Sequence, residues 1–401
     1  MIKNNHDIYF NASTSCSKVL FKEIVERVSQ SGESGELPYI EFEDIISGEG
    51  KLNKDIFQRS TKKVGKRFNP DDVLFGKLRP YLRNIFFADT TGIAVGDFWV
   101  LRPTGIDPYL LYLLVNSQTF MKVANISSGS KMPRADWELV SNMEIVIPDS
   151  RQSQQSISEF FKSIDSYIVG VSNKLASLKQ IKSACLQSMF PQEGESVPKV
   201  RFKGFNEEWK KDKLSKFVSR ITRKNKNLES NLPLTISATD GLISQLQYFN
   251  NIVASANLSG YYLIKNGEFA YNKSYSNGYP FGSIKRLDKY DMGALSTLYI
   301  IFGIKDNSFG IDSDYLTTFF STTLWHHEVA ERAEEGARNH GLLNIGADDF
   351  LDINIIYPKD LAEQQQIATY FKNLDQQISL QTQRLEKLKQ IKSACLDKMF
   401  V

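Results

Sequence analysis

The chain has 401 residues, of which 49 are Lys or Arg and 46 are Asp or Glu, so its formal net charge is +3. This charge is too small to indicate nucleic-acid binding by itself. A composition with 41% hydrophobic and 24% charged residues excludes a disordered, collagen-like or disulfide-scaffold protein, and the length is typical of two or three domains.

The sequence contains no segment long enough to span a membrane. Its longest apolar runs, such as 109–115 and 299–303, fall well short of the roughly 18 residues required. Residues 1–7 lack the apolar core of a signal peptide, and the three cysteines are odd in number. We therefore expect a reducing, cytoplasmic setting.

In the first 150 residues, basic side chains are concentrated between Lys62 and Arg83, with seven Lys or Arg against Asp71 and Asp72. Residues 69–72 predict a turn that opens a strand at residues 73–75. The alternative interpretation of Asp71, Asp72 and Lys77 is a set of nuclease carboxylates with a lysine. Another basic loop, with Gly129, lies at 127–134, directly before the next predicted strand.

Residues 143–148 alternate apolar and polar side chains and end at Pro148, which predicts a strand with one buried face. The segment that follows predicts a long helix, because apolar residues recur at spacings of four and three over three heptads, a pattern that makes a helix pair with another helix. The alternative is that this helix only caps its own domain.

The second half of the chain repeats this organisation. Residues 152–190 match 362–400 at a constant offset of 210 with 19 identities in 39 positions, including nine consecutive identities at 178–186 and 388–396. The strand before the second helix, 353–358, also ends in proline. The chain is therefore a tandem duplication of a variable globular unit followed by a near-constant helix.

The linker and second globular unit carry further basic and aromatic residues. Residues 199–226 hold 11 Lys or Arg against three acidic residues, and 273–279 form a Lys- and Tyr-containing loop like the one at 77–83. Residues 335–340 form a second Gly and basic loop before the final strand. Long cations can reach phosphates, and Arg or Asn can read base edges.

Catalytic motifs are missing from the sequence. It has no phosphate-binding loop of the G-x-x-x-x-G-K-[ST] type, no H-E-x-x-H, no C-x-x-C and no G-x-S-x-G. His326 and His327 lack a third ligand at helical spacing, so a metal site is not predicted there. The chain is predicted to bind rather than to catalyse.

The sequence resembles the DNA-specificity subunit of type I restriction-modification systems over nearly its whole length. The resemblance rests on the duplicated helix ending in 178–190, on the Gln-rich helix starts at 154–157 and 363–367, on the linker 198–205 with Trp209, and on the alternation of variable and constant units. One departure concerns residues 1–18, which show no copy of that linker, so that the start is either shortened or diverged.

The resemblance implies an α+β fold with a pseudo-twofold internal repeat. Two target-recognition domains, residues 1–150 and 205–360, would be joined by two conserved helices, 151–190 and 361–401, packed as an antiparallel coiled coil, with a linker at 191–204. Each domain would read half of a bipartite, asymmetric DNA target, and the helices would set the spacer and dock two methyltransferase subunits. Restriction subunits would join them, and S-adenosylmethionine, ATP and Mg²⁺ would belong to these partners.

We name candidate residues for both kinds of contact from loop chemistry and heptad position. The DNA-binding candidates are Lys77, Arg79, Arg83, Lys131 and Arg134 in the first domain and Lys273, Tyr275, Arg338, Asn339 and His340 in the second. The partner-helix seam candidates are Ile157, Phe161, Ile164, Ile168, Leu175, Leu178, Ile367, Phe371, Leu374, Ile378, Leu385 and Leu388.

Two other classes of function remain open at this point. A non-catalytic protein-interaction scaffold with duplicated binding domains is compatible with the weak net charge, and a monomeric nuclease is disfavoured by the missing motifs. The salt dependence of binding separates the first alternative from DNA recognition, because neutralising phosphates releases counterions and makes affinity fall steeply with salt.

Overall fold

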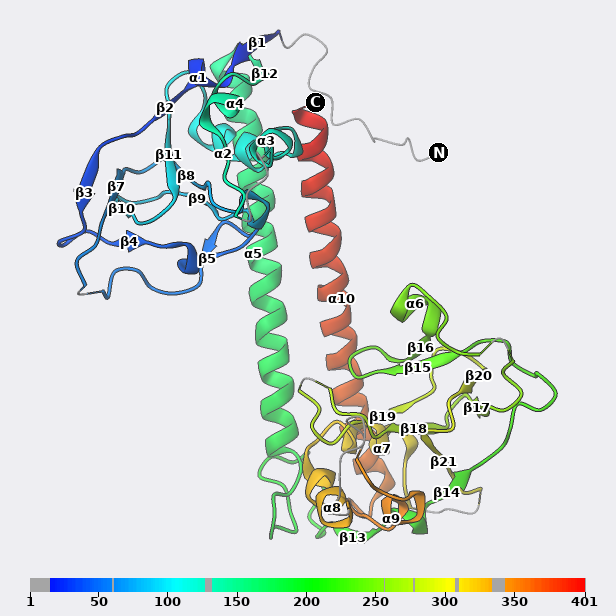
Figure 1. Cartoon of the computed structure of the whole chain (residues 1–401). Helices are drawn as coiled ribbons and strands as arrows, with labels where there is room; N and C mark the ends of the chain where they lie inside the picture. Colours follow the sequence, from blue (N-terminus) through cyan, green and yellow to red (C-terminus); the bar gives the residue numbers. More distant parts are fainter. Residues whose placement is uncertain are drawn as a thin grey trace, which may run out of the picture. The chain divides into compact units, whose positions relative to one another are not determined.

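A computed structural model of the chain describes residues 15–59, 61–126, 132–255, 257–276, 278–306, 310–333 and 343–400 (Figure 1). The chain divides into two compact units, Met1–Asn173 with Thr382–Val401 and Lys174–Gln381. The division falls inside the two long helices, α5 (Arg151–Ser188) and α10 (Leu361–Met399), so each unit contains one globular part and a section of both helices.

The first unit is a mixed arrangement of short strands and helices. Its elements before α5 are β1 (Cys16–Leu20), α1 (Phe21–Ile24), β2 (Val25–Arg27), β3 (Ser31–Glu33), β4 (Tyr39–Ile40), η1 (Phe42–Asp44), β5 (Ile45–Ile46), β6 (Lys51–Leu52), β7 (Val64–Phe68), β8 (Val73–Gly76), η2 (Pro80–Leu82), β9 (Ile85–Phe87), β10 (Gly92–Ala94), β11 (Phe98–Pro103), α2 (Pro108–Asn116), α3 (Gln118–Ala124), α4 (Trp137–Ser141) and β12 (Glu144–Pro148). The predicted turn at 69–72 and the strand after it are confirmed.

The central sheet of the first unit has the order β2–β11–β8–β9, with all neighbours antiparallel. A second sheet, β3–β7–β10–β4, pairs β10 with β4 in parallel. In β8, Val73 and Phe75 face one apolar core whereas Leu74 faces another. Because both faces are covered, the strand is an unbroken apolar run instead of an alternating one.

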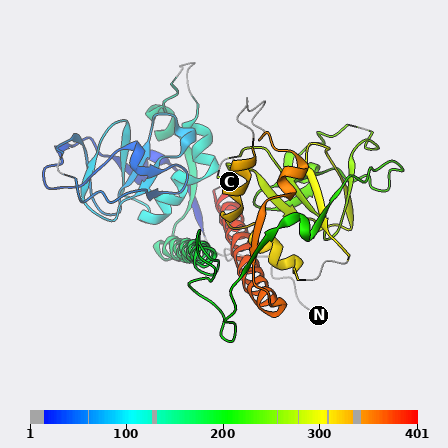
Figure 2. The same cartoon turned by 90° about the horizontal axis from the view of Figure 1, so that it is seen from below.

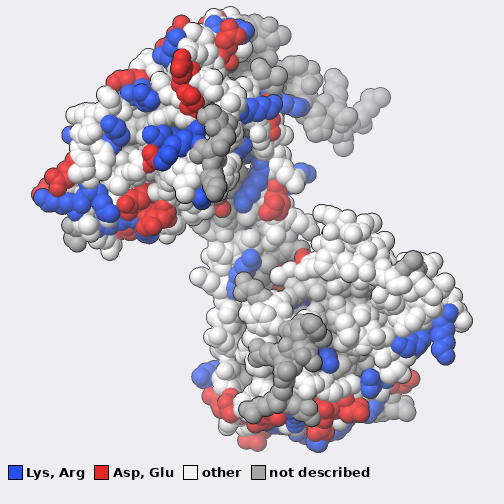
Figure 3. Space-filling view, viewed as in Figure 1, with Lys and Arg blue, Asp and Glu red and all other residues white. Residues whose placement is uncertain are grey.

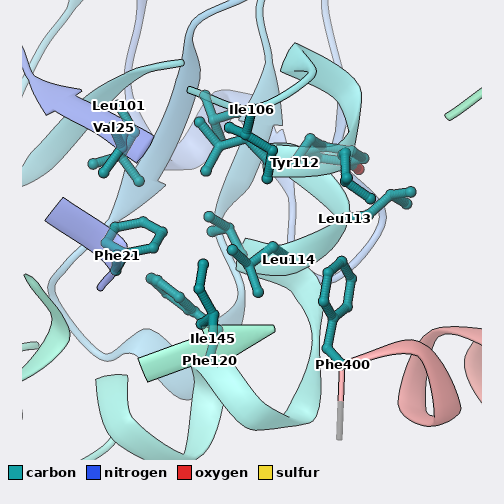
Figure 4. Packing of buried hydrophobic residues seen from close by; sticks show 14 of the residues in the cluster. Phe21, Val25, Leu101, Ile106, Tyr112, Leu113, Leu114, Phe120, Ile145 and Phe400 are labelled. Carbon is teal, nitrogen blue, oxygen red and sulfur yellow. The ribbon is translucent and has the colours of Figure 1, made fainter. Parts of the chain in front are cut away.

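The larger core of the first unit joins the central sheet to helices and to the end of the chain. Helices α2, α3 and α4 lie together beside this sheet (Figures 1 and 2). Phe21, Phe120 and Ile145 meet in this core, and Phe400, from beyond the end of α10, is buried in it (Figure 4). The Thr119 hydroxyl donates a hydrogen bond to the Phe400 carbonyl. Leu396, near the end of α10, is buried in the same core, so the last turn of α10 is part of the first globular unit.

The second unit has a similar sequence of elements. They are β13 (Lys210–Lys213), η3 (Leu214–Lys216), β14 (Val218–Ile221), β15 (Leu234–Ser237), β16 (Gly241–Ser244), α6 (Gln245–Phe249), β17 (Tyr262–Lys265), β18 (Phe269–Asn272), β19 (Ser283–Arg286), β20 (Met292–Leu295), β21 (Ile300–Ile304), α7 (Ser313–Phe319), α8 (Leu324–Arg332), α9 (Ala347–Leu351) and β22 (Asn354–Tyr357), followed by α10.

The duplication inferred from the sequence is also a duplication of topology. The central sheet of the second unit has the order β14–β21–β18–β19, which matches β2–β11–β8–β9 strand for strand. In each unit a two-stranded sheet, β1–β12 or β13–β22, leads into the long helix. Phe269 and Tyr271 face one core and Ala270 faces another, as their counterparts in β8 do. The predicted α+β class and internal repeat are confirmed.

Candidate DNA interface

In the first unit, the connection between β8 and β9 brings together several of the predicted DNA-binding residues. Lys77 follows β8 directly, and Leu78 forms an isolated antiparallel bridge with Arg134. Arg134 donates two hydrogen bonds to Asp97 Oδ2, at 2.8 and 3.1 Å, and Lys77 Nζ lies 3.5 Å from Asp97 Oδ1. Two candidate cations thus share one carboxylate that sequence reasoning missed.

The protonation state of Asp97 controls how much positive charge this cluster presents. Partial burial raises the pKa of Asp97, but the hydrogen bond from Arg134 and the charge of Lys77 lower it by more, so the pKa of this carboxyl lies below its ordinary value. Asp97 is therefore ionised at neutral pH and orients both cations. All three side chains are partly exposed, so the cluster is accessible to a ligand.

The other candidates of the first unit have different surroundings. Arg79 is exposed, and its side chain has no ion pair or hydrogen bond to the residues that the structure describes. The Arg83 guanidinium instead donates to the Asn116 carbonyl at 3.1 Å, so it braces the connection against α2. Lys131 lies outside the described residues. Asp72 forms a bidentate pair with Arg102, at 2.9 and 2.7 Å, and has a structural role.

The second unit places its candidates on the matching connection, between β18 and β19. Lys273 directly follows β18, as Lys77 follows β8, and its Nζ donates to the Ile345 carbonyl at 3.1 Å. Tyr275 is exposed over 58% of its surface. Arg338, Asn339 and His340 lie outside the described residues. The two connections therefore occupy equivalent positions but carry different chemistry.

The two units also differ in their surface charge. On the face shown in Figure 3, Lys and Arg alternate with Asp and Glu over the first unit, whereas the surface over α6 is uncharged. Residues 241–264 contain no Asp, Glu, Lys, Arg or His. No group of three or more potential metal ligands occurs within the described ranges, and no helix there is long and apolar enough to cross a membrane.

The repeated helices use the same ion pair in both units. Lys392 Nζ lies 2.5 Å from Asp165 Oδ1 in the first unit, and Lys182 Nζ lies 2.5 Å from Asp375 Oδ1 in the second. Asp165 corresponds to Asp375, and Lys182 corresponds to Lys392, at the offset of 210. In the first unit Asp165 contacts Lys392 and Tyr167 contacts Arg384, and in the second unit Lys182 contacts Asp375 and Cys185 contacts Tyr370. Because residue numbers rise along α5 as they fall along α10, the two helices are antiparallel within each unit.

The seam candidates lie on the inner side of these helices. Those that are buried are Ile157, Phe161, Ile168, Leu175, Leu178, Ile367, Phe371 and Leu374, and those that are partly buried are Ile164, Ile378, Leu385 and Leu388. Phe161 and Phe371 belong to the cores of their globular units. The seam is therefore filled by this chain's own packing, and a separate protein would have to bind another face.

Several identical residues of the repeat are exposed instead. Ile181 and Ile391 are 46% and 41% exposed, and Lys179, Gln180, Ser183 and Ala184 are exposed like their counterparts 389, 390, 393 and 394. Neighbouring exposed positions have diverged, such as Ala176 against Glu386. Packing within the chain does not explain why exposed residues are identical in the two copies of the repeated helix. We call these residues the repeated outer face.

The residues that join helix to globular unit were also missed from sequence. In each unit a buried glutamine, Gln154 or Gln364, accepts a hydrogen bond from the backbone N–H of the residue that caps α2 or α7, at 2.8 or 2.7 Å. Arg201 of the linker makes a bidentate pair with Glu363, at 2.7 and 2.8 Å. Only the repeated Gln154-Gln155 and Gln364-Gln365 could have signalled the first contact.

Comparison with known proteins identifies the domain type. Residues 21–180 match the model of the type I restriction modification DNA specificity domain. Residues 21–180 therefore contain a type I restriction-modification DNA specificity domain. No curated protein sequence matches it at a significant level. Since the second half repeats the helix and topology of the first, it contains a second globular unit of the same fold.

Solved structures show the same fold at low sequence identity. The chain is similar to the specificity subunit of a type I restriction-modification system from M. genitalium, with 12% identity, 98% coverage of both chains and a TM-score of 0.61. It is also similar to a chain from a study of complex assembly and conformational transition of the type I system, with 18% identity, 96% and 97% coverage and a TM-score of 0.53.

Proposed function

We propose that this chain reads a bipartite, asymmetric DNA sequence, with one half-site for each globular unit. The family match carries the proposal, and the duplicated topology supports two reading units. The chain is a non-catalytic recognition subunit. Methyl transfer with S-adenosylmethionine would belong to methyltransferase subunits, and cleavage with ATP and Mg²⁺ to restriction subunits.

The chemistry of the two connections supports an asymmetric target. In the first unit, Lys77 and Arg134 are arranged around Asp97. At the matching place in the second unit, Lys273 bonds to a backbone carbonyl and Tyr275 extends into solvent. Base recognition depends on which donors and acceptors reach the base edges, so different side chains at equivalent positions favour different half-sites.

The repeated outer face supports binding of one type of protein subunit at two places. Exposed residues that stay identical while their neighbours diverge are expected where both helices contact copies of the same partner. The face combines an exposed isoleucine with Lys, Gln and Ser, and a non-obligate protein interface is as a whole only about as apolar as the rest of the surface. We assign it to two methyltransferase subunits, one for each copy of the repeat.

The decisive experiment for DNA recognition is a methylome. The chain is expressed with its neighbouring methyltransferase in a host that lacks adenine methylation, and the DNA is sequenced with modification-sensitive reads. We expect a bipartite, asymmetric methylated motif that appears only when this chain is present. Binding of the methyltransferase without any new methylation would contradict the recognition role, and no binding at all would favour the scaffold.

The docking assignment is tested by subunit stoichiometry. Ile181→Asp and Ile391→Asp should each lower the number of bound methyltransferase subunits from two to one, and the double variant should bind none. Ala176→Glu is the matched control, because position 386 already carries Glu. Native mass spectrometry measures the stoichiometry, and full occupancy in the double variant would contradict the assignment.

A further inference from the structure

Each unit exposes one tyrosine on the equivalent connection of its central sheet. Tyr81, between β8 and β9, is 56% exposed, and Tyr275, between β18 and β19, is 58% exposed. Neither ring makes a ring contact or a side-chain hydrogen bond with the described part of the chain. Other exposed tyrosines do have partners: Tyr248 packs on Phe249 at 4.7 Å, and Arg384 lies over the ring of Tyr167 at 4.8 Å.

The two connections are equivalent in the fold but not in sequence. Phe75 pairs with Ile85 across β8 and β9, and Tyr271 pairs with Ile284 across β18 and β19. The residues between these strands share the lysine that follows the first strand and little else besides an exposed tyrosine. An exposed aromatic ring without a side-chain partner among the described residues therefore occurs at the equivalent edge of the central sheet in both units.

The connection that carries Tyr81 is braced on both sides. Arg79 and Arg83 have φ values of 50° and 52°, a left-handed conformation that is unfavourable for residues with a Cβ. The surrounding contacts hold them there: Arg79 N donates to the Pro133 carbonyl at 2.7 Å, and the Arg83 side chain bonds to the Asn116 carbonyl. Tyr81 lies in the 3-10 turn between them.

The connection that carries Tyr275 is closed in a different way. Ser276 and Tyr279 bridge across its tip, with Tyr279 N donating to the Ser276 carbonyl at 2.8 Å. At its far end Gly282 has φ of 76°, and a Cβ there would lie 2.0 Å from the Asn272 carbonyl oxygen. Backbone hydrogen bonds thus brace described residues beside each tyrosine, which lowers the entropy lost when a ligand binds.

The surroundings of the two rings match nucleic acid better than an apolar protein surface. The exposed side chain of Arg79, which has no partner among the described residues, lies two residues from Tyr81, and Lys273 lies two residues from Tyr275. Aromatic side chains stack on bases of any identity, or enter between base pairs and kink the duplex. Adjacent cations then contact the phosphates on either side.

We propose that Tyr81 and Tyr275 are base-stacking residues, one for each half of the DNA target. This inference rests on the proposed function, because it assigns a particular contact within the DNA interface. The rings would position each unit on its half-site, while the Asp97-oriented cations of the first unit and the polar side chains of the second would supply sequence discrimination.

The test uses the full chain assembled with its methyltransferase and duplex DNA carrying the target found by the methylome. Tyr81→Ala and Tyr275→Ala should each weaken target binding about 5- to 150-fold, the loss typical of one stacked base. The slope of log affinity against log salt should not change, because stacking releases no counterions. Tyr81→Phe and Tyr275→Phe should bind like the wild type, since the ring is kept.

Phe57→Ala in the first unit and Tyr248→Ala in the second serve as controls, because both remove an exposed aromatic from other surfaces. Fluorescence of 2-aminopurine in one half-site should respond to the wild-type complex and lose that response only with the matching tyrosine variant. Unchanged affinity of both Ala variants, Phe variants as weak as Ala, or loss of methyltransferase binding would overturn the stacking role. A wild-type complex that does not bind the target would overturn the proposed function itself.

Discussion

Gln154 and Gln364 are single residues that attach each long helix to its globular unit. Gln364 accepts from Asp312 N at 2.7 Å and donates to the Gly310 and Pro358 carbonyls at 2.9 and 2.8 Å. Gln154 makes the equivalent bond to the Pro148 carbonyl at 2.8 Å. Both side chains are buried, and a leucine in place of either one would leave these backbone groups without the amide as a partner.

Gln364→Leu should therefore destabilise the protein by about 1–3 kcal/mol, because it leaves buried backbone groups without partners. Gln365→Leu, at the exposed neighbouring position, is the control and should have little effect. Thermal unfolding of the full chain measures both. Equal melting temperatures for the two variants would show that the amide contacts contribute nothing.

Asp44 is a buried carboxylate that should make the stability of the chain depend on pH. Arg59 donates to both of its oxygens, at 2.8 and 2.5 Å, and Lys54 Nζ lies 2.8 Å away. Burial raises the pKa of Asp44, but the hydrogen bonds from Arg59 and Lys54 lower it by more, so its pKa lies below the ordinary value near 4.

A carboxylate whose folded pKa is depressed stabilises the folded state above its unfolded pKa and loses that effect as pH falls through the folded value. The melting temperature should therefore fall below about pH 4. Asp44→Asn should be less stable than the wild type at pH 7 and should lose less on acidification. Parallel pH profiles for the two proteins would contradict this role.

At the scale of elements, the apolar seam of the long helices is interrupted by a buried polar side chain, that of Gln381. Gln381 is buried, and its amide oxygen has no hydrogen-bond partner in the described ranges. The equivalent position of the first helix is Val171, which is also buried. A polar residue at a seam position commonly fixes helix register at a cost in stability.

Gln381→Leu is predicted to stabilise the chain by about 1 kcal/mol, because it removes a buried acceptor that lacks a partner. Gln377→Leu, on the exposed face of the same helix, is the control. Chemical denaturation of the full chain gives the difference. A lower stability for Gln381→Leu than for the wild type would mean that the amide contributes through its packing or through its NH₂ group.

At the scale of the whole molecule, the proposed function makes the long helices a ruler for the DNA spacer. Seven residues inserted after Ile168 and seven after Ile378 would lengthen both helices by about 10 Å, equivalent to about 3 base pairs of duplex. The methylome of this variant should contain both original half-sites with a longer spacer. An unchanged spacer would rule out the ruler role.

The elements that the sequence predicted correctly are those whose signals are local. Heptad spacing predicted α5 and α10, alternation ending in proline predicted β12 and β22, and Asn69–Asp72 predicted the turn before β8. The constant offset of 210 predicted a duplicated fold, because two helices with nearly the same sequence need similar surfaces to pack against. The heptad, alternation and turn signals each depend on residues within a few helical turns or one strand of each other.

What only the tertiary structure decided are contacts between residues distant in the chain. Asp97 holds Lys77 and Arg134, whereas Arg83, equally basic in sequence, turns inward to the Asn116 carbonyl. Nothing local distinguishes these arginines, because the outcome depends on which acceptor the folded sheet and helices bring within reach. By itself the sequence determined the repeat, the helices and the family resemblance. Folding decided which cations and rings remain exposed for a ligand, since only packing determines which polar groups are already paired.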